Sequence, residues 1–361
     1  MSGGPIMVMA GGTGGHVFPA LAVARVLRER GVAVVWLGTP GGMEARLVPA
    51  DGFPIEWLRI AGVRGKGVLV WLLAPLRLAR AVVEAAGILR RRRPRAVLGA
   101  GGFVSGPGAI AAWLLRIPLL IHEQNAIAGT TNRWLARIAR EVLEAFPGSF
   151  AANVHARCIG NPVRADIAAL ELPRLRFAPR SGRIRILVIG GSRGARRLNE
   201  LLPAAVARLD AERRPEIRHQ TGERDLSVVR DAYARSGIDA RTSAFIDDMA
   251  EAYAWADLAV CRAGALTIAE LQAAGLGAIL VPFPAAIDDH QTKNAEVLAG
   301  IGAARIAQER DLDAGRLAGM LGGFAADRAG LLAMAEAARA SAVGDAAARL
   351  ADLCIAAGGS P

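Results

Sequence analysis

The sequence predicts an α/β protein built from two Rossmann-like, doubly wound, parallel-sheet domains, and three observations carry that prediction. The chain has 361 residues, which is long for a single hydrophobic core. Short apolar runs alternate with longer segments of helical periodicity, as strands and covering helices do around a parallel sheet. A strand, a glycine-rich loop and a helix follow one another twice, at residues 6–24 and 184–202.

The apolar runs place buried strands at 6–9, 32–37, 96–98, 119–121, 184–189, 258–261 and 278–281. Helical periodicity covers 19–30 and 198–210, a further helix is expected to begin near residue 265, and a last apolar helix spans about 345–358. The segment from Gly160 to Arg183, rich in proline and arginine, reads as a linker. We therefore expect a first domain at 1–162, with the last helix packed back on it, and a second domain at 163–344.

Composition restricts the class of protein. The chain is 53% hydrophobic, which is typical of a globular protein, and its net charge is +11. Nearly all basic residues are arginines. A GC-rich genome explains the use of arginine in place of lysine, but not the positive net charge, which favours an anionic partner.

Three scattered cysteines without a CxxC pair indicate a reducing compartment and no zinc site. No signal peptide is expected, and the longest apolar stretches are too short to span a bilayer, so we expect a cytoplasmic protein that can touch a membrane.

The first glycine loop reads AGGTGGHVFPA over residues 10–20. Glycines allow close approach of a ligand, and the following helix N-terminus favours an anion. The spacing is not GxGxxG, and the second strand ends without a carboxylate, so the fingerprint of a nicotinamide enzyme is absent. His16 has no place in a dinucleotide loop, so the sequence raises the question of which phosphate ligand also needs an imidazole.

The second half contains a strand, a tight Arg262-Ala263-Gly264 turn and a helix. The first backbone N–H groups of that helix, with the Thr267 hydroxyl, suit a diphosphate. Glu270 can accept hydrogen bonds from a ribose diol, or it is an ordinary solvated carboxylate. Residues 289–294, DHQTKN, are dense in groups that bind sugars, or they cap a helix. Asp311-Leu312-Asp313 is expected to start a helix rather than hold a metal, so backbone dipoles and Arg164 would meet the diphosphate charge.

Eight motifs in chain order resemble the MurG family of N-acetylglucosaminyltransferases, and the match spans about residues 6 to 300. They are GGTGGHVFPALAVA, GAGGFVSGP, IHEQNAIAGTTNRWLA, GNPVR, GGSRGARRLN, FIDDM, CRAGALTIAEL and DHQTKNA. The resemblance implies a GT-B fold, with the two domains facing a cleft. It also implies transfer of GlcNAc from UDP-GlcNAc to the MurNAc 4-hydroxyl of lipid I with inversion, giving lipid II, and it implies no cofactor and no required metal.

The resemblance also implies roles for single residues. The family's contacts to UDP-GlcNAc fall on Thr13, Gly14, Gly15, Asn125, Arg164, Ser192, Ile246, Ala265, Leu266, Thr267, Ile268, Ala269, Glu270 and Gln291. Ile246 would present its backbone to uracil, Glu270 would bind the ribose and Gln291 the sugar hydroxyls. A glycosyl transfer needs a base for the attacking hydroxyl, and His16 is the natural one, although a packing or phosphate-binding role is the alternative. Glu123 is the second candidate base, and His122, His155 and His219 are expected to be structural. The acceptor loops would include Gly101, Gly102 and Asn132. Ala263 and Arg193 depart from the residues expected in the family, and Ala263 removes a hydroxyl near the diphosphate.

Two other functions share the donor groups. A non-hydrolysing UDP-GlcNAc 2-epimerase would have no use for the acceptor loops, and a nucleotide-sugar sensor would have no use for a base. Turnover with and without a lipid-linked acceptor separates the three.

Residues 64–95 combine an apolar stretch with a basic run. Trp71, Leu72 and Leu73, flanked by Arg77 and Arg80, are expected to form a membrane patch, unless the stretch packs inside the first domain. The expected location is peripheral, on the cytoplasmic face of the bacterial inner membrane. The expected partners are UDP-GlcNAc, lipid I and an anionic membrane surface, without nucleic acid; cell-wall synthesis or division proteins are compatible partners.

Overall fold

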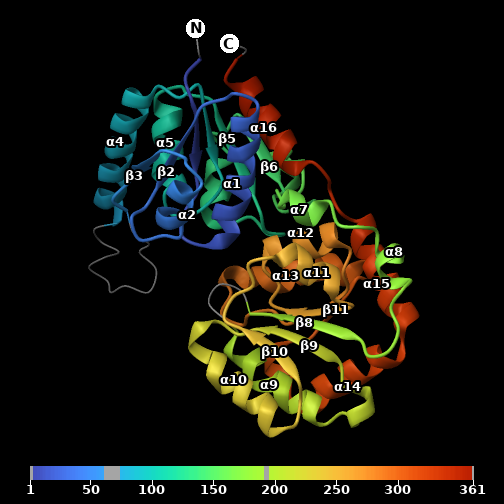
Figure 1. Ribbon diagram of the computed structural model, residues 1–361. Coiled ribbons are helices and arrows are strands. Elements are labelled where there is room, and N and C mark those ends of the chain that lie inside the picture. The colour runs from blue at the N-terminus through green and yellow to red at the C-terminus, as the bar shows by residue number, and fades with distance from the viewer. Residues whose placement is uncertain (1–2, 61–73, 191–194, 360–361) are drawn as a thin grey trace. The chain divides into compact units, whose positions relative to one another are not determined.

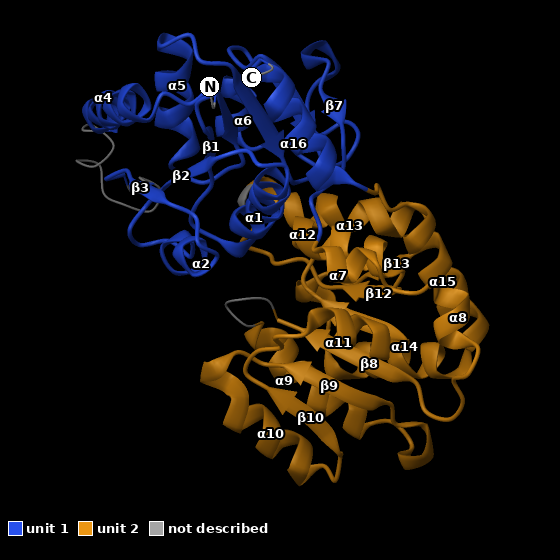
Figure 2. Cartoon of the chain, turned by 45° about the horizontal axis from the view of Figure 1, so that its top comes forward, with its two compact units in different colours: residues 1–163, 345–361 blue, residues 164–344 orange. Residues whose placement is uncertain are grey.

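A computed structural model of the chain describes residues 3–60, 74–190 and 195–359. The chain forms two compact units (Figure 2): unit 1 comprises Met1–Val163 and Asp345–Pro361, and unit 2 comprises Arg164–Gly344. Each unit contains one parallel sheet covered by helices (Figure 1), so the predicted fold class is confirmed. The sequence placed the boundary after residue 162, and the structure places it after Val163. In the described residues, no helix is both long enough and apolar enough to cross a membrane.

Unit 1 has a seven-stranded sheet in the order β3-β2-β1-β4-β5-β6-β7, with every pairing parallel. The strands are β1 (Ile6–Met9), β2 (Val34–Gly38), β3 (Ile55–Trp57), β4 (Ala96–Gly99), β5 (Leu119–Glu123), β6 (Glu141–Glu144) and β7 (Arg157–Cys158). The helices are α1 (Gly14–Glu29), α2 (Glu44–Ala50), α4 (Ala74–Arg92), α5 (Ser105–Leu114), α6 (Thr130–Leu135) and α16 (Ala346–Ala357).

Helices cover both faces of the sheet of unit 1. Alternate residues of a strand point to opposite sides, so each central strand contributes to two cores. Ile6 and Val8 pack in one core with α1 and α16, whereas Met7 and Met9 pack in another with α4 and α5. Helix α16 lies against α1, so the end of the chain completes the first core. The central strands are therefore apolar throughout, which is why the sequence reveals them.

Helix α1 begins earlier than the sequence suggests. Pro19 indicated the start of a helix, but it lies inside α1, which begins at Gly14 with Thr13 as its N-cap residue. As a consequence, His16 lies in the first turn of α1.

Unit 2 has a six-stranded parallel sheet in the order β10-β9-β8-β11-β12-β13. The strands are β8 (Arg185–Ile189), β9 (Glu216–Gln220), β10 (Ala240–Ser243), β11 (Leu258–Cys261), β12 (Ala278–Leu280) and β13 (Ala304–Ile306). The helices are α7 (Ala165–Ala168), α8 (Pro173–Phe177), α9 (Arg196–Ala207), α10 (Leu226–Arg235), α11 (Met249–Trp255), α12 (Ala265–Ala274), α13 (His290–Gly300), α14 (Ala314–Ala326) and α15 (Arg328–Ala340). Helices α9, α10 and α14 cover one face, and α11, α12 and α13 cover the other (Figure 1).

Most of the segment expected to be a linker is a folded part of unit 2, which begins at Arg164. Helix α8 carries Arg176, which is buried and donates to the carbonyl oxygens of Tyr253, Ala274 and Gly275 at 3.1, 2.5 and 2.6 Å. These carbonyls lie near the C-terminus of α11 and at that of α12, where unpaired acceptors favour a cation. Its proline and arginine content suggested a linker, but here Arg176 anchors two helix ends.

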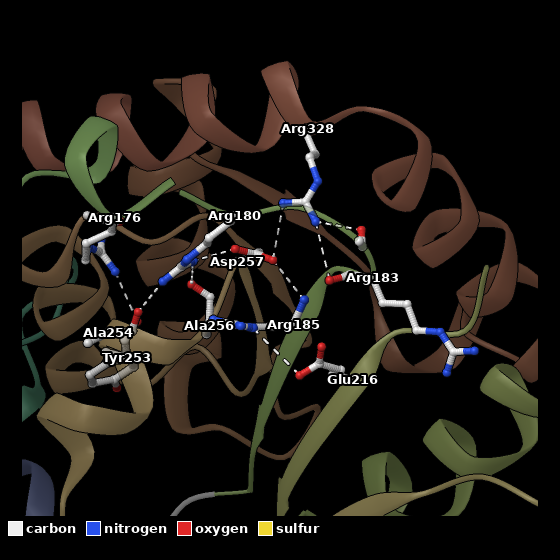
Figure 3. Close-up of polar contacts among 12 residues, drawn as sticks. Arg176, Arg180, Arg183, Arg185, Glu216, Tyr253, Ala254, Ala256, Asp257 and Arg328 are labelled. Atoms are coloured by element: carbon white, nitrogen blue, oxygen red, sulfur yellow. Dashed lines mark hydrogen bonds and ion pairs between the residues drawn. The ribbon is translucent and has the colours of Figure 1, made fainter. Parts of the chain in front are cut away.

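Asp257 supplies a negative charge among the arginines that surround this part of unit 2 (Figure 3). Its side chain is almost fully buried and forms an ion pair with Arg180, and it accepts the backbone N–H of Arg185 at 2.9 Å. Arg328 approaches the same carboxylate at 3.8 Å. Because a buried charge is costly without a partner, this cluster fixes the segment after α8 to β8 and α11.

Candidate functional site

The glycine loop between β1 and α1 is held by one buried carboxylate, that of Glu44. Its Oε2 accepts the Gly12 N–H at 2.8 Å, and its Oε1 accepts the N–H and the hydroxyl of Thr39 at 2.9 and 2.7 Å. A Cβ at Gly11 would lie 2.5 Å from Glu44 Oε1, so glycine there makes room for the carboxylate. Glu44 thus fixes the backbone that leads into His16.

Sequence reasoning missed Glu44, because it looked for an acidic residue only at the end of β2. The available signal was an isolated acid after a glycine pair, in the stretch GGMEARL. Its role depends on a contact with Gly12, 32 residues away in the chain, which local patterns do not reveal.

The His16 ring lies against the first of the two expected acceptor loops. A Cβ at Gly101 would lie only 2.4 Å from His16 Nδ1, and Gly101 has a φ of +102°. Both facts require glycine at that position. The ring's Nδ1 is 3.2 Å from Gln124 Oε1, so the imidazole is held by a glycine on one side and an amide on the other.

Gly102 brings the two glycine loops of unit 1 into contact. With a φ of +86°, it lies so close to Gly11 that a Cβ would be 2.4 Å from the Gly11 carbonyl oxygen. The buried Ser105 hydroxyl fixes this turn, since it is 2.8 Å from the Gly101 carbonyl and 3.1 Å from that of Met9. The structure therefore gathers His16, Gly101 and Gly102 at the carboxyl edge of β1 and β4.

The carboxylate of Glu123 orders the loop after β5. It is buried and accepts four hydrogen bonds: from the N–H and the side-chain amide of Asn125, both at 3.0 Å, from Gly129 N–H at 3.0 Å, and from the Asn132 amide at 2.8 Å. Both oxygens are thus engaged in positioning the loop that holds Asn125 and Asn132. This geometry favours a positioning role for Glu123 over proton abstraction.

His122 is a neutral, buried residue. Burial lowers its pKa to about 4, and its Nε2 lies 3.0 Å from the carbonyl oxygen of Gly160. His219 of unit 2 is likewise buried between Tyr233 and Asn199, at 3.0 Å from each, and burial lowers its pKa to about 3. Both histidines have structural surroundings of the kind expected from the sequence.

In unit 2, the turn before α12 is fixed from two sides. Asn294, fully buried on α13, donates to the Ala263 carbonyl at 3.1 Å. Arg262 donates to the carbonyls of Val281 and Pro282 at 3.1 and 3.3 Å and pairs with Glu309 at 2.5 Å. Gly264 is the N-cap residue of α12, so Ala265, Leu266, Thr267, Ile268 and Ala269 form the start of a helix whose N-terminus is rigidly placed. Ala263 is completely buried.

Glu270 is held by two partners. Its Oε1 accepts Arg164 Nη2 at 3.2 Å, and its Oε2 accepts the Tyr253 hydroxyl at 3.0 Å. Burial raises the pKa of Glu270, and Arg164 opposes that rise. Burial, followed by the nearby Glu270 charge, raises the pKa of Tyr253 well above its usual value, so its hydroxyl remains a donor. Sequence reasoning connected neither partner with Glu270 and did not identify Tyr253.

The remaining donor candidates described in unit 2 are Gln291, on a helix, and Ile246, on a connecting segment. Gln291, in the first turn of α13, accepts the Phe283 N–H through its Oε1 at 3.0 Å, which directs its amide group away from that bond. Ile246 is half-buried in the segment between β10 and α11. Asp313 caps α14 by accepting the Arg316 N–H at 2.8 Å, which confirms that the Asp311-Leu312-Asp313 motif starts a helix.

Several expected residues lie outside the described part of the chain: Ser192, Arg193, Trp71, Leu72 and Leu73. The adjoining helix α4 is described, and both Arg77 and Arg80 are exposed on it. Leu76 and Val83 are 70% and 72% exposed. Within the three described ranges, no group of three His, Cys, Asp or Glu side chains is arranged to hold a metal ion.

Comparisons with known proteins agree with this geometry. Residues 6–144 match the glycosyltransferase family 28 N-terminal domain, and residues 185–350 match the family 28 C-terminal domain. A Marinobacter nauticus protein named UDP-N-acetylglucosamine–N-acetylmuramyl-(pentapeptide) pyrophosphoryl-undecaprenol N-acetylglucosamine transferase is 55% identical over 349 residues, covering 97% of this chain and 96% of that protein. A Nitrosococcus oceani protein of the same name is also 55% identical, covering 97% of this chain and 98% of its own length.

Solved structures show the same relation. MurG of Acinetobacter baumannii matches with a TM-score of 0.85 and 42% identity, over 97% of this chain and 99% of that one. The glycosyltransferase of kitacinnamycin matches with a TM-score of 0.68 at 18% identity, over 99% of this chain and 100% of that one, and shows likeness of fold alone.

Proposed function

Because the chain belongs to the MurG family, within glycosyltransferase family 28, we infer that it is an N-acetylglucosaminyltransferase that converts lipid I to lipid II. The carrying observation is 55% identity, over nearly the whole of both chains, to proteins whose names state this transfer. The donor is UDP-GlcNAc, and the acceptor is undecaprenyl-pyrophosphoryl-MurNAc-pentapeptide. Both domains of a GT-B enzyme are present.

Unit 2 is proposed to bind the nucleotide half of the donor. The N-terminus of α12 is assigned to the diphosphate, because the helix dipole favours an anion at that end. Glu270 is assigned to the ribose diol, with Arg164 beside it as a further donor contact. Gln291 is assigned to the GlcNAc hydroxyls through its amide, and Ile246 to uracil through its backbone. The family resemblance adds Thr13, Gly14, Gly15 and Asn125 of unit 1 as donor contacts.

Unit 1 is proposed to bind the acceptor and supply the base. The MurNAc 4-hydroxyl oxygen attacks the anomeric carbon of GlcNAc, the bond from that carbon to UDP breaks, and UDP leaves with the electron pair. His16 takes the hydroxyl proton, since a neutral imidazole is a suitable base near neutral pH. Attack opposite to the leaving group inverts the anomeric carbon. Gly101, Gly102 and Asn132 shape the acceptor side, and no metal is assigned a role.

Unit 1 is also proposed to dock on the cytoplasmic face of an anionic membrane through α4. Leu76, Arg80 and Val83 are spaced at i, i+4 and i+7, so they share one face of the helix. Ala81, Ala85 and Ile88 are buried, so they mark the face that packs on the domain. An exposed face that combines apolar and basic residues is typical of a helix lying at a membrane interface. The lipid-linked acceptor requires such an approach, because its chain stays in the bilayer.

The experiment that tests the function is turnover of UDP-GlcNAc with and without a lipid-linked acceptor. We expect UDP release and a disaccharide product only when lipid I, or a shorter-chain analogue, is present. Epimerisation of UDP-GlcNAc without acceptor, or binding without any turnover, would contradict the proposal.

A further inference from the structure

A series of hydrogen bonds leads from the partly buried His16 side chain to buried residues of unit 1. His16 Nδ1 is 3.2 Å from Gln124 Oε1, and Gln124 Nε2 is 2.8 Å from the Ala100 carbonyl and 3.4 Å from His122 Nδ1. His122 Nε2 is 3.0 Å from the Gly160 carbonyl. Gln124 is buried, and the proposed function assigns it no contact with the donor or the acceptor.

Two carbonyl oxygens, those of Ala100 and Gly160, determine which atom donates in each hydrogen bond of this series. The Ala100 carbonyl only accepts, so the atom of Gln124 beside it is the amide nitrogen, and the amide oxygen must face His16. The Gly160 carbonyl only accepts as well, so His122 carries its proton on Nε2, and its Nδ1 accepts from Gln124. The low pKa of His122, about 4, is consistent with this neutral form.

We propose that Gln124 is a positioning residue that holds His16 in the tautomer with the proton on Nδ1. An amide oxygen can only accept, so His16 must donate from Nδ1, and the lone pair of the neutral ring then lies on Nε2. The inference rests on the proposed function in one respect: Nε2 is the atom that takes the proton of the acceptor hydroxyl. A histidine with its proton on Nε2 has no lone pair there and cannot act as that base.

The surroundings of Gln124 explain why one amide can fix the ring. Its backbone carbonyl accepts the Asn161 side-chain amide at 3.0 Å, and its own side chain is anchored on Ala100, next to Gly101. Gly101 in turn limits where the imidazole can lie. The ring is therefore restrained by packing against Gly101 and by its directional hydrogen bond to Gln124, as the orienting group of a catalytic histidine must restrain it.

The test compares Gln124→Leu with Gln124→Glu. Leucine has a similar volume but cannot accept a hydrogen bond, so we expect kcat to fall at least about tenfold while the KM for UDP-GlcNAc stays within about twofold. As a protonated carboxylic acid, glutamate can donate to the Ala100 carbonyl and keep its other oxygen toward His16, so it should recover part of the loss. Gln272→Leu is the matched control, since it removes a buried glutamine that bonds Ser341 in unit 2, and it should leave kcat unchanged.

A spectroscopic measurement separates positioning from general damage. Nitrogen chemical shifts of protein labelled with 15N-histidine distinguish protonated from unprotonated ring nitrogens; the chain has five histidines, and the His16→Ala spectrum assigns the signals. We expect His16 to be protonated on Nδ1 in the wild type and to lose that preference in Gln124→Leu.

The proposal is overturned if the tautomer of His16 is the same in Gln124→Leu as in the wild type, or if that variant keeps its kcat. Failure of the proposed function looks different: the tautomer would respond to Gln124, but His16→Ala would retain its turnover, or the wild type would transfer no sugar.

Discussion

At the residue scale, the proton transfer proposed for unit 1 depends on the His16 imidazole, which lies between Gly101 and Gln124. Gly101 leaves no room for a side chain beside the ring, and Gly102 leaves none beside Gly11. The carboxylates of Glu44 and Glu123 already accept hydrogen bonds from backbone N–H groups of the surrounding loops. His16 is thus the residue of this cluster to which proton transfer can be assigned.

We expect His16→Ala to lower kcat by about a hundredfold or more, with a much smaller change in the KM for UDP-GlcNAc, because loss of a general base costs about 10²–10⁴ in rate. Steady-state kinetics with a lipid I analogue measure both constants. The acidic limb of the wild-type pH–rate profile should be absent from the variant. An unchanged kcat with a raised KM would instead make His16 a binding residue.

The ribose site proposed for unit 2 provides a second test at this scale. Tyr253→Phe removes the hydroxyl that bonds Glu270 at 3.0 Å, so the carboxylate loses a partner in a buried site. A hydrogen bond to a charged group contributes about 1.5–3 kcal/mol, which predicts a rise of about tenfold or more in the KM for UDP-GlcNAc with little change in kcat.

The chain offers a matched control for that variant, since it has only two tyrosines. Tyr233 is equally buried, but its hydroxyl bonds His219. Tyr233→Phe should leave the KM unchanged, and an equal rise in both variants would show a general loss of structure.

These residues also show what the sequence could and could not reveal. His16, Glu270 and Gln291 stand in motifs beside glycine turns or helix starts, so their residue type and position suggest a role. Glu44 and Tyr253 act on partners 32 and 17 residues away, and the contact exists only after the sheet has formed. The roles of Gln124 and Asn132 depend on hydrogen-bond direction, which a spacing pattern does not contain.

At the element scale, some strands can be predicted from the sequence and others cannot. The central strands β1, β4, β8 and β11 are covered on both faces, so they are apolar runs and the sequence predicts them. Strands β6, β9 and β10 contain charged or hydroxyl side chains in EVLE, EIRHQ and ARTS, and no run of apolar residues marks them. Their place in the sheet follows from pairing with a neighbour.

The corner around Asp257 predicts a large loss of stability. Asp257→Ala leaves Arg180 buried without its counter-charge, and breaking a buried pair in this way costs about 3–5 kcal/mol. Urea unfolding measures the difference. Glu200→Ala breaks an exposed ion pair with Arg196 in the same unit and should cost less than about 1 kcal/mol. Equal effects of the two substitutions would contradict the role assigned to Asp257.

His122 predicts how the stability of unit 1 depends on pH. Its pKa is about 4 in the folded state and about 6.5 when unfolded, so between these values the unfolded state binds a proton that the folded state does not. Above pH 6.5 both states are neutral and the contribution is constant; as the pH falls toward 4, stability falls by about 1.4 kcal/mol per pH unit.

The variant His122→Gln should therefore show a shallower decline between pH 6 and 4, whatever its stability at pH 8. Unfolding curves at a series of pH values provide the slope. A slope equal to that of the wild type would show that His122 does not titrate in this way.

At the scale of the whole molecule, the chain leaves unit 1 once and returns to it. Helix α16 packs on α1, so unit 1 is built from both ends of the sequence. The repeated strand–loop–helix theme predicted two domains, and the apolar character of the last helix predicted that it is covered. The sequence could not show that most of the expected linker is folded. Arg176 of α8 is held by carbonyl groups at helix ends of unit 2, and those contacts exist only in the folded unit.

Membrane docking is the last prediction at this scale, and α4 makes it testable without disturbing either core. Leu76 and Val83 are largely exposed, so Leu76→Ser/Val83→Ser should leave the melting temperature and donor binding unchanged. The double variant should lose flotation with phosphatidylglycerol vesicles, because the apolar contribution to binding is removed. High salt should also release the wild type, since each basic residue near an anionic surface contributes about 1 kcal/mol and that contribution is screened. Leu175→Ser/Val228→Ser is the matched control, with two exposed apolar residues of unit 2, and should float as the wild type does. If the α4 variant also floats as the wild type does, the docking surface lies elsewhere on the chain.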